Sequence, residues 1–320
     1  MSEASDLLCA EAQRLAGAGR WAEAEGVLRR ALAAHPHEPS VLSNLGIVLA
    51  RVGQREEAIA LLERATSLAP DNQAVRQNLS RVRSSSAPQM TDRQLEVQAS
   101  NLAYNMAVKR VITENNVNCV LDVGANVGDF AMHLRKLGYG DRIVSIEPAS
   151  KPYDELAARA AMDARWKTLN LAAGRSTGTA QLKILGDSVL NTLGDPDPQQ
   201  IRDFGRRGQV VGEETVRVEP LDALWNELFD GLAAPRVLLK IDTQGHDQEV
   251  LAGASQRVLP VVAGLQVELS ITRLYVQSPT LTQSLEPLLA GGWGIVGMYP
   301  TARYEDNHTA IELDCLMTRV

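Results

Sequence analysis

The sequence feature that most constrains the fold is an apolar segment that runs directly into a glycine turn. Residues 120–128 read Val-Leu-Asp-Val-Gly-Ala-Asn-Val-Gly, and a helix-like segment follows them. A second apolar segment, residues 143–146, ends on the carboxylate of Glu147. Open α/β sheets bind ligands at the carboxyl ends of parallel strands, where glycine admits a ligand to the main chain and an acid accepts ribose hydroxyls. The pattern predicts a parallel sheet that binds a nucleoside-bearing ligand.

Strand-like and helix-like segments alternate from residue 117 onwards, which is typical of a Rossmann-like α/β sheet with helices on both faces. The segment at 236–241 is apolar except for one lysine, as expected of a central strand. A polar excursion at 186–212 is expected to cover the substrate, because long loops in compact domains often bind ligands. The predicted strands are 117–123, 142–147, 166–171, 179–185, 215–218, 236–241, 261–269, 294–298 and 311–317, and the predicted helices are 126–137, 153–161, 221–229 and 281–289.

The start of the chain has a different organisation, because it repeats itself. Pro36 recurs as Pro70, 34 residues later, and the same spacing relates Leu8, Leu15, Ala24, Leu28 and Ala31 to Leu42, Leu49, Ala58, Leu62 and Ala65. This is the period of tetratricopeptide (TPR) repeats, which form all-α helical pairs. A third copy begins at residues 72–83 and ends after one helix, as a capping element does. Two uses stay open: docking or self-association, and capture of a partner peptide.

These observations divide the chain into three parts. Residues 1–85 are the TPR-like repeats, 86–116 a linker and lead-in helix, and 117–320 the α/β domain. A flexible serine-rich joint is predicted at residues 84–88. The lead-in helix is predicted at residues 91–114 and commonly packs over the ligand cleft in such domains; among its apolar positions are Leu95, Leu102, Met106 and Ile112.

Composition excludes several classes of function. The net charge of −7 argues against a nucleic-acid-binding protein, which needs a basic face. No apolar segment approaches the roughly 20 residues of a membrane span, and the N-terminus lacks the pattern of a signal peptide. Cys9, Cys119 and Cys315 lie far apart and are interpreted as buried thiols in a reducing compartment. We therefore expect a cytoplasmic location and neither nucleic acid nor membrane as partner.

The residues around the turn favour one cofactor. The turn lacks the Gly-x-Gly-x-x-Gly spacing of dinucleotide-binding proteins, and the chain has no phosphate-binding loop. Asp122, just before the turn, would repel a pyrophosphate but suits a ligand with an ammonium and a sulfonium group. These are the charges of S-adenosyl-L-methionine. Glu147 is expected to hold its ribose and Pro148 to flank its adenine; the full set of predicted cofactor contacts is Asp122, Gly124, Ala125, Asn126, Gly128, Glu147 and Pro148.

Several motifs together resemble those of the FkbM family of S-adenosylmethionine-dependent methyltransferases. They lie at residues 122–128, 145–148, 239–247 and 250–254, with a later match at 267–270. The resemblance covers about residues 117–320 and implies a seven-stranded methyltransferase sheet. It also implies methylation of an oxygen on a sugar, a polyketide or a related metabolite. One departure is Asp247, which stands where family members often carry glutamate.

Three residues are candidates for the chemistry of methyl transfer: Asp242, His246 and Glu268. Asp242 ends the central strand, where it would orient the acceptor hydroxyl, bind a metal, contact the cofactor, or cap the next helix. His246 would serve as general base or would simply face water at a helix start. The three side chains together would suit a divalent ion, but their spacing is not that of a standard site, and we predict no metal.

The resulting prediction is an enzyme that methylates a hydroxyl group of a sugar, glycan or secondary metabolite. The expected partners are a small-molecule or glycan acceptor and, through the repeats, a protein or a second copy of the chain. Two alternatives stay open: a TPR scaffold protein that binds the cofactor without catalysis, and an N-methyltransferase that acts on an amino sugar.

Overall fold

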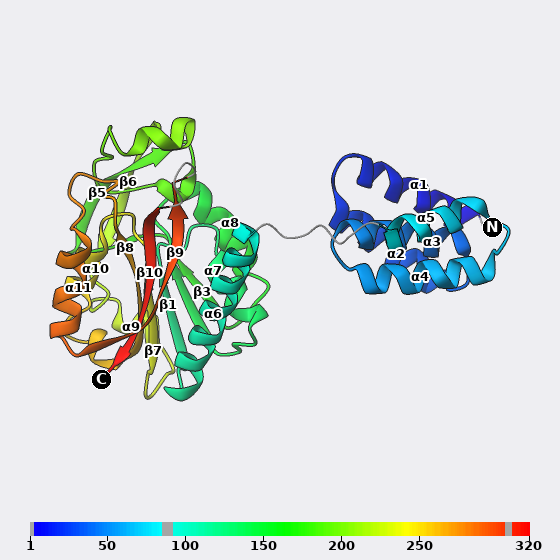
Figure 1. The fold of residues 1–320 in the computed structure, drawn as a ribbon. Coiled ribbons are helices and arrows are strands. Elements are labelled where there is room, and N and C mark those ends of the chain that lie inside the picture. Colours follow the sequence, from blue (N-terminus) through cyan, green and yellow to red (C-terminus); the bar gives the residue numbers. More distant parts are fainter. Residues whose placement is uncertain (1–2, 85–91, 305–308) are drawn as a thin grey trace. The chain divides into compact units, whose positions relative to one another are not determined.

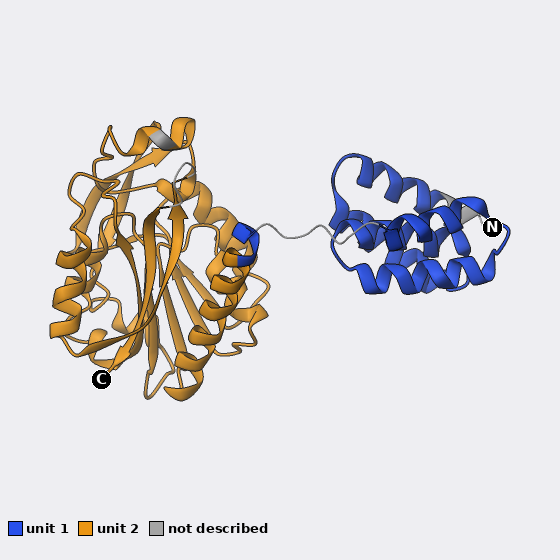
Figure 2. Cartoon of the chain, in the orientation of Figure 1, with its two compact units in different colours: residues 1–95 blue, residues 96–320 orange. Residues whose placement is uncertain are grey.

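The computed structural model describes residues 3–84, 92–304 and 309–320, and it falls into two compact units (Figure 2). Unit 1 is Met1–Leu95 and unit 2 is Glu96–Val320. Apart from Ser84, the predicted joint at residues 84–88 lies outside the described residues. We keep the predicted three-part division of the chain as a proposal.

Unit 1 is built from helices in the order that the repeat predicts (Figure 1). The described helices are α1 (Glu3–Gly17), α2 (Trp21–Ala34), α3 (Pro39–Arg51), α4 (Arg55–Leu68) and α5 (Gln73–Ser84). Most of the repeating leucines, such as Leu28 and Leu62, are fully buried in one core, and Leu8 is partly buried against it. A Cβ on Gly46 would lie 2.7 Å from Leu62 Cγ, so this glycine allows α3 and α4 to cross closely. The small and large repeat positions are therefore explained by helix packing.

A seven-stranded sheet forms the centre of unit 2, as predicted (Figure 1). Its order is β3-β2-β1-β7-β8-β10-β9. Neighbours from β3 to β8 pair in parallel, whereas β10 is antiparallel to both β8 and β9. The strands are β1 (Cys119–Val123), β2 (Arg142–Ile146), β3 (Trp166–Leu169), β7 (Val237–Ile241), β8 (Val262–Ser270), β9 (Trp293–Arg303) and β10 (Ala310–Arg319). The chain order reverses between β1 and β7, which is the switch point at which such sheets bind ligands.

Helices cover both faces of this sheet (Figure 1). One face carries α6 (Asp92–Glu114), α7 (Asp129–Lys136) and α8 (Ser150–Ala160), and the other α9 (Trp225–Phe229), α10 (Asp247–Gly253) and α11 (Leu281–Ala290). The alternation of side chains along each strand supplies both cores. In β1, Val120 packs in the α6 and α7 core, whereas Leu121 and Val123 pack in the opposite one.

The polar excursion is an ordered substructure. It lies between β5 (Gly178–Leu185) and β6 (Val210–Glu219), which pair with β4 (Ala172–Ala173) in a second, three-stranded sheet. Within it are two short 3-10 helices, η1 (Ser188–Leu190) and η2 (Ile201–Gly208); a third, η3 (Leu259–Val261), precedes β8. Leu190 and Ile201 pack with Tyr275 in a small core of their own, so the excursion is anchored to the domain.

Some expectations about helices were wrong in extent. The predicted helix at 126–137 begins only at Asp129, because Asn126 and Gly128 have positive φ angles of 48° and 87°. The helix predicted at 221–229 is limited to α9. Of the apolar positions named for α6, Leu102 and Met106 are 61% and 66% exposed, whereas Ile112 packs on the core beside Val108 and Val111.

Two expectations from composition can be compared with the structure. Cys9, Cys119 and Cys315 are buried and free, as predicted. None of the helices described combines the length and apolar character that crossing a membrane requires.

Candidate functional site

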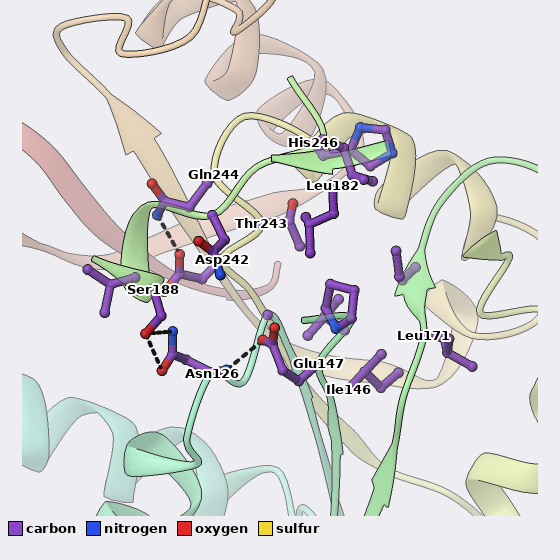
Figure 3. Close-up of a pocket in the computed structure, with 18 residues that line it drawn as sticks. Asn126, Ile146, Glu147, Leu171, Leu182, Ser188, Asp242, Thr243, Gln244 and His246 are labelled. Atoms are coloured by element: carbon purple, nitrogen blue, oxygen red, sulfur yellow. Dashed lines mark hydrogen bonds between the residues drawn. The ribbon is translucent and has the colours of Figure 1, made fainter. Parts of the chain in front are cut away.

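A pocket of about 650 Å³ opens at the switch point between β1 and β7 (Figure 3). The strands lie in register there, with Val123 paired to Ile241, and each continues into a turn that forms part of the wall. Six of the ten predicted site residues line the pocket: Gly124, Asn126, Glu147, Pro148, Asp242 and His246. The other four, which are Asp122, Ala125, Gly128 and Glu268, lie outside its lining.

Packing within the protein explains why glycine is required at both positions of the turn after β1. Gly124 has φ = 77°, and a Cβ there would lie 1.8 Å from the carbonyl oxygen of Asp242. Gly128 has φ = 87°, and a Cβ there would lie 2.7 Å from Leu156 and 2.8 Å from Trp166. Gly124 thus lets the turns after β1 and β7 meet, and Gly128 lets α7 start against α8 and β3. Close approach of a ligand is not needed to explain either glycine.

Glu147 faces the pocket from the end of β2 (Figure 3). Its Oε2 accepts a hydrogen bond from the backbone N–H of Asn126 at 2.8 Å, and its Oε1 accepts one from Ala149 at 2.9 Å. Burial raises the pKa of this carboxyl to about 7, against the opposing effect of the two amides. A carboxylate oxygen can accept two hydrogen bonds, so each oxygen keeps one acceptor position for a ligand hydroxyl.

Asp122 is fully buried beneath the pocket and is paired within the chain. Its Oδ1 lies 3.3 Å from Lys240 Nζ, and its Oδ2 accepts a hydrogen bond from Ser145 at 3.2 Å. Lys240 also lies 3.2 Å from Asp242 Oδ2, and its ammonium is 5.5 Å from the centre of the Phe130 ring. Burial raises the pKa of Asp122 despite Lys240. The charge that was expected to face a cationic ligand therefore faces an ammonium of the protein itself.

Gln244, which the sequence analysis did not select, connects two of the candidate catalytic acids. Its amide nitrogen donates to Asp242 Oδ1 at 3.0 Å and to Glu268 Oε2 at 2.8 Å, and its Oε1 accepts from the Tyr275 hydroxyl at 2.7 Å. Thr192 holds its backbone carbonyl through a bond of 2.7 Å. The turn that places it has positive φ at Gln244 (51°) and at Gly245 (91°). Glu268 thus lies behind Gln244 and reaches the pocket only through it.

His246 and Asp247 begin α10 with different roles. The half-buried His246 side chain lines the pocket, and burial lowers the pKa of its imidazole, which favours the neutral form. The carboxylate of Asp247 reaches back and accepts hydrogen bonds from the backbone N–H and the hydroxyl of Thr243. Asp247 therefore fixes the turn. Asp242, by contrast, does not bind this turn through Thr243: its carboxylate accepts a hydrogen bond from Gln244 and pairs with Lys240.

Further carboxyls stand beside these groups on the last strands of the sheet. Asp314 of β10 is paired in register with Glu268 of β8, and Glu312 lies two residues before Asp314 on β10. Burial and neighbouring carboxylates raise the pKa of Glu268 well above its ordinary value, that of Glu312 to about 8 and that of Asp314 to about 6. Among the described residues, no group of His, Cys, Asp and Glu has an arrangement that would hold a metal ion.

With this geometry established, comparison with protein families gives two matches. Residues 122–280 match the model of the methyltransferase FkbM domain, and residues 15–82 match a tetratricopeptide repeat. The chain carries an FkbM methyltransferase domain behind TPR repeats. This agrees with the resemblance in the sequence motifs, and the family is one of S-adenosylmethionine-dependent methyltransferases.

The chain is similar to parts of known proteins. Protein arginine N-methyltransferase 9 of Homo sapiens and of Mus musculus are 28% and 27% identical over 127 residues, which is 40% of this chain but 15% of theirs. A methyltransferase FkbM structure from Methylobacillus flagellatus KT is 18% identical, covers 62% of this chain and 43% of that chain, and has a TM-score of 0.39. An Aeropyrum pernix fibrillarin structure with natively bound S-adenosyl-L-methionine is 10% identical, covers 63% and 66%, and has a TM-score of 0.36.

The walls of the FkbM domain's pocket include residues that the sequence analysis missed. Thr243 and Gln244 lie within the motif at 239–247, so that motif was a usable signal for them. Leu171 and Ala172 follow β3, and the same rule of strand ends would have found them. Leu182 comes from the second sheet, and no pattern in the sequence pointed to it. Ser188 and Asn191 line the pocket from the excursion, which was expected to cover the site.

Proposed function

We propose that this chain uses S-adenosyl-L-methionine to methylate a hydroxyl group of a sugar, glycan or secondary metabolite. The observation that supports this most directly is the pocket at the switch point of the FkbM domain. It brings Glu147, at the end of β2, to the same cavity as Asp242, at the end of β7. The first is suited to a ribose and the second to the reacting end of the ligand. A cytoplasmic location and partner binding through the repeats belong to the same proposal.

Cofactor binding in this proposal relies on unused acceptor positions. The oxygens of Glu147 would each accept a ribose hydroxyl beside the amides that they already bind. Pro148 and Leu171 offer apolar contacts for the adenine, and Gly124 and Asn126 line the pocket toward the methionine end. Asp122 would act indirectly, because it fixes Lys240 and thereby the charge around Asp242.

The acceptor hydroxyl must lose its proton as its oxygen takes the methyl group, for which S-adenosyl-L-methionine supplies the leaving group. The neutral imidazole of His246 is suited to accept that proton, and Asp242 to orient the hydroxyl. Gln244 holds Asp242 in place and links it to Glu268. In this assignment Glu268 is a positioning residue.

An amine acceptor is the second candidate. The specific observation in its favour is the group of acids Glu268, Glu312 and Asp314 near Asp242, because a cationic acceptor would favour ionisation of these acids, whose pKa values burial and mutual repulsion raise. An amine also needs a less demanding base than an alcohol. The curated relatives named above are arginine N-methyltransferases, but this chain spans only 15% of their length.

The cofactor assignment is tested by the variant Glu147→Gln. Because the amide offers one acceptor oxygen in place of two, we expect the affinity for S-adenosyl-L-methionine to fall about tenfold. Isothermal titration calorimetry measures this, with Glu155→Gln as the matched control, since Glu155 is an exposed residue of α8 outside the pocket. Equal affinity of the two variants would remove Glu147 from the site. No heat with the unmodified protein would refute the whole proposal.

Catalysis is separated from mere cofactor binding by Asp242→Asn. The variant keeps the shape of the side chain, so we expect retained cofactor binding and at least about a hundredfold slower methyl transfer. The assay uses methyl-labelled cofactor with glycan and metabolite extracts, and mass spectrometry of the labelled product assigns oxygen or nitrogen. Unchanged turnover would exclude Asp242 from the chemistry. Absence of transfer by the unmodified protein would favour the scaffold alternative.

A further inference from the structure

A second pocket, of about 480 Å³, lies in the FkbM domain on the other side of the turn that follows β7. Different residues of that turn line the two pockets. Asp242, Gln244 and His246 line the first, whereas Gly245 and Asp247 line the second. No lining residue is common to both. The second pocket is thus a separate cavity between α10, the end of β8 and α11.

A buried hydroxyl without a hydrogen-bond partner in the described part of the chain belongs to the wall of this cavity. Ser278 is 3% exposed and lines the pocket, and its Oγ has no hydrogen-bond partner among the described residues. The Oγ lies 2.6 Å from the position that a Cβ on Gly245 would occupy, so the glycine leaves room for it. A buried hydroxyl without a partner destabilises the fold, and natural proteins rarely keep one without a reason. A ligand that bonds to this hydroxyl would supply the reason.

Two carboxyls add to the polar lining. Glu268 uses Oε2 to accept from Gln244, and Asp247 uses Oδ1 to accept from Thr243. Burial and the neighbouring carboxylates raise the pKa of Glu268 well above its ordinary value. Burial also raises the pKa of Asp247, to about 6. The pocket therefore presents both donors and acceptors at one side.

The remaining walls are apolar or weakly polar. Leu251, Leu269 and Leu288 give an apolar surface, and Ser270 and Ser284 add hydroxyls. The described lining holds no lysine, arginine or histidine, so it offers no counter-charge to an anion. A ring with one apolar face and several hydroxyls would match this distribution of groups. Such a molecule stacks C–H groups on the leucines while its hydroxyls meet Ser278, Asp247 and Glu268.

We propose that this second pocket binds a small neutral polyol of monosaccharide size, at a site distinct from the pocket that Glu147 and Asp242 line. The hydroxyl of Ser278 is the group that the ligand satisfies. The proposal does not depend on methyl transfer, because binding alone is claimed.

Binding is tested with the full chain by saturation-transfer NMR and thermal shift, with methyl α-D-glucopyranoside, methyl α-D-mannopyranoside and methyl β-D-galactopyranoside as probes. We expect saturation transfer to at least one of them and a raised Tm in its presence. Ser284→Trp fills the cavity and abolishes both signals, whereas Glu286→Trp, on the exposed side of α11, leaves them unchanged. Equal binding by the two variants overturns the proposal, and so does lack of binding of all three sugars. D-Glucosamine, tried in parallel, overturns it if it alone binds.

Ser278→Ala separates a ligand-binding hydroxyl from a structural one. Because the hydroxyl has no partner in the described structure, we expect the Tm of the ligand-free variant to be equal or higher. Its affinity for the bound sugar falls about fivefold or more. A lower Tm of the free variant, or unchanged affinity, overturns the assignment of Ser278.

Discussion

At the scale of residues, two nitrogen atoms hold the acids of this site together. Lys240 Nζ is shared between Asp122 and Asp242, and the Gln244 amide nitrogen between Asp242 and Glu268. Removing one partner of a buried pair leaves an uncompensated charge, which is far more destabilising than replacing the whole pair. These residues therefore form one interacting network, and the effect of a substitution at any one of them depends on its neighbours.

At the same scale, we predict that Gly124→Ala destabilises unit 2 by about 3 kcal/mol or more, because its Cβ would overlap the Asp242 carbonyl at a positive φ. Gly138→Ala is the matched control. Gly138 also has a positive φ, 92°, but no atom lies within 4 Å of its Cβ position, so about 1 kcal/mol is expected. Urea unfolding followed by tryptophan fluorescence in a Trp21→Phe background measures both. Similar losses in the two variants would show that the contact with Asp242 is unimportant.

At the scale of secondary-structure elements, the pairing of β8 with β10 places Glu268 opposite Asp314. Burial of these side chains is the main cost of their ionisation, and the charges of Asp242 and of neighbouring acids add to it. The raised pKa values of Glu268, Glu312 and Asp314 follow from this arrangement. This edge of the sheet is therefore expected to lose stability as the pH rises.

The prediction concerns Glu312, whose pKa is about 8 in the folded protein, against 4.5 for an unperturbed glutamate such as that of the unfolded chain. The folded protein retains a proton that the unfolded chain releases, so the stabilisation is present below pH 4.5 and is lost as the pH rises through 8. Glu312→Gln keeps the neutral form, and we expect it to stabilise unit 2 by about 1–3 kcal/mol at about pH 8 and by much less at about pH 5. Urea titrations at both pH values check this, with the exposed Glu286→Gln as control. The same effect at both pH values would contradict it.

The secondary-structure elements also show which features of the structure could be predicted from the sequence. Apolar segments of the right length and the Gly124 turn were sufficient to predict the sheet and the pocket at the ends of β1 and β7. The role of Gln244 was not recognised, because its partners Glu268 and Tyr275 come from distant parts of the sequence and the contacts depend on register and rotamer. The sheet of β4, β5 and β6 was only partly anticipated, since β4 is two residues long. Local patterns report which face is buried, but they do not report which buried polar groups meet.

For the whole molecule, the two units have separate cores. The buried residues of unit 1 form one cluster, and every residue that lines the two FkbM pockets belongs to unit 2. Each unit thus contains what it needs to bury its own apolar surface, and the site does not require the repeats for its walls. The TPR segment is then expected to determine where or with what the enzyme works.

We predict that residues 92–320 alone bind S-adenosyl-L-methionine with an affinity within about twofold of the full chain. The reason is that α6 starts at Asp92 and the pocket lining lies after it. Calorimetry on the two proteins compares the affinities, and circular dichroism confirms that the shorter one is folded. A folded short protein with much weaker binding would show that the repeats contribute to the cofactor site.

Gln244 has one more consequence for a protein with two neighbouring cavities. A primary amide donates to both acids, but at ordinary pH it neither takes up nor releases a proton. No relay of protons can therefore run along this bridge from Glu268 to Asp242, and whatever happens to one acid reaches the other only as an electric field. The amide thus prevents direct proton transfer between the two acids, although the charge of Asp242 still raises the pKa of Glu268.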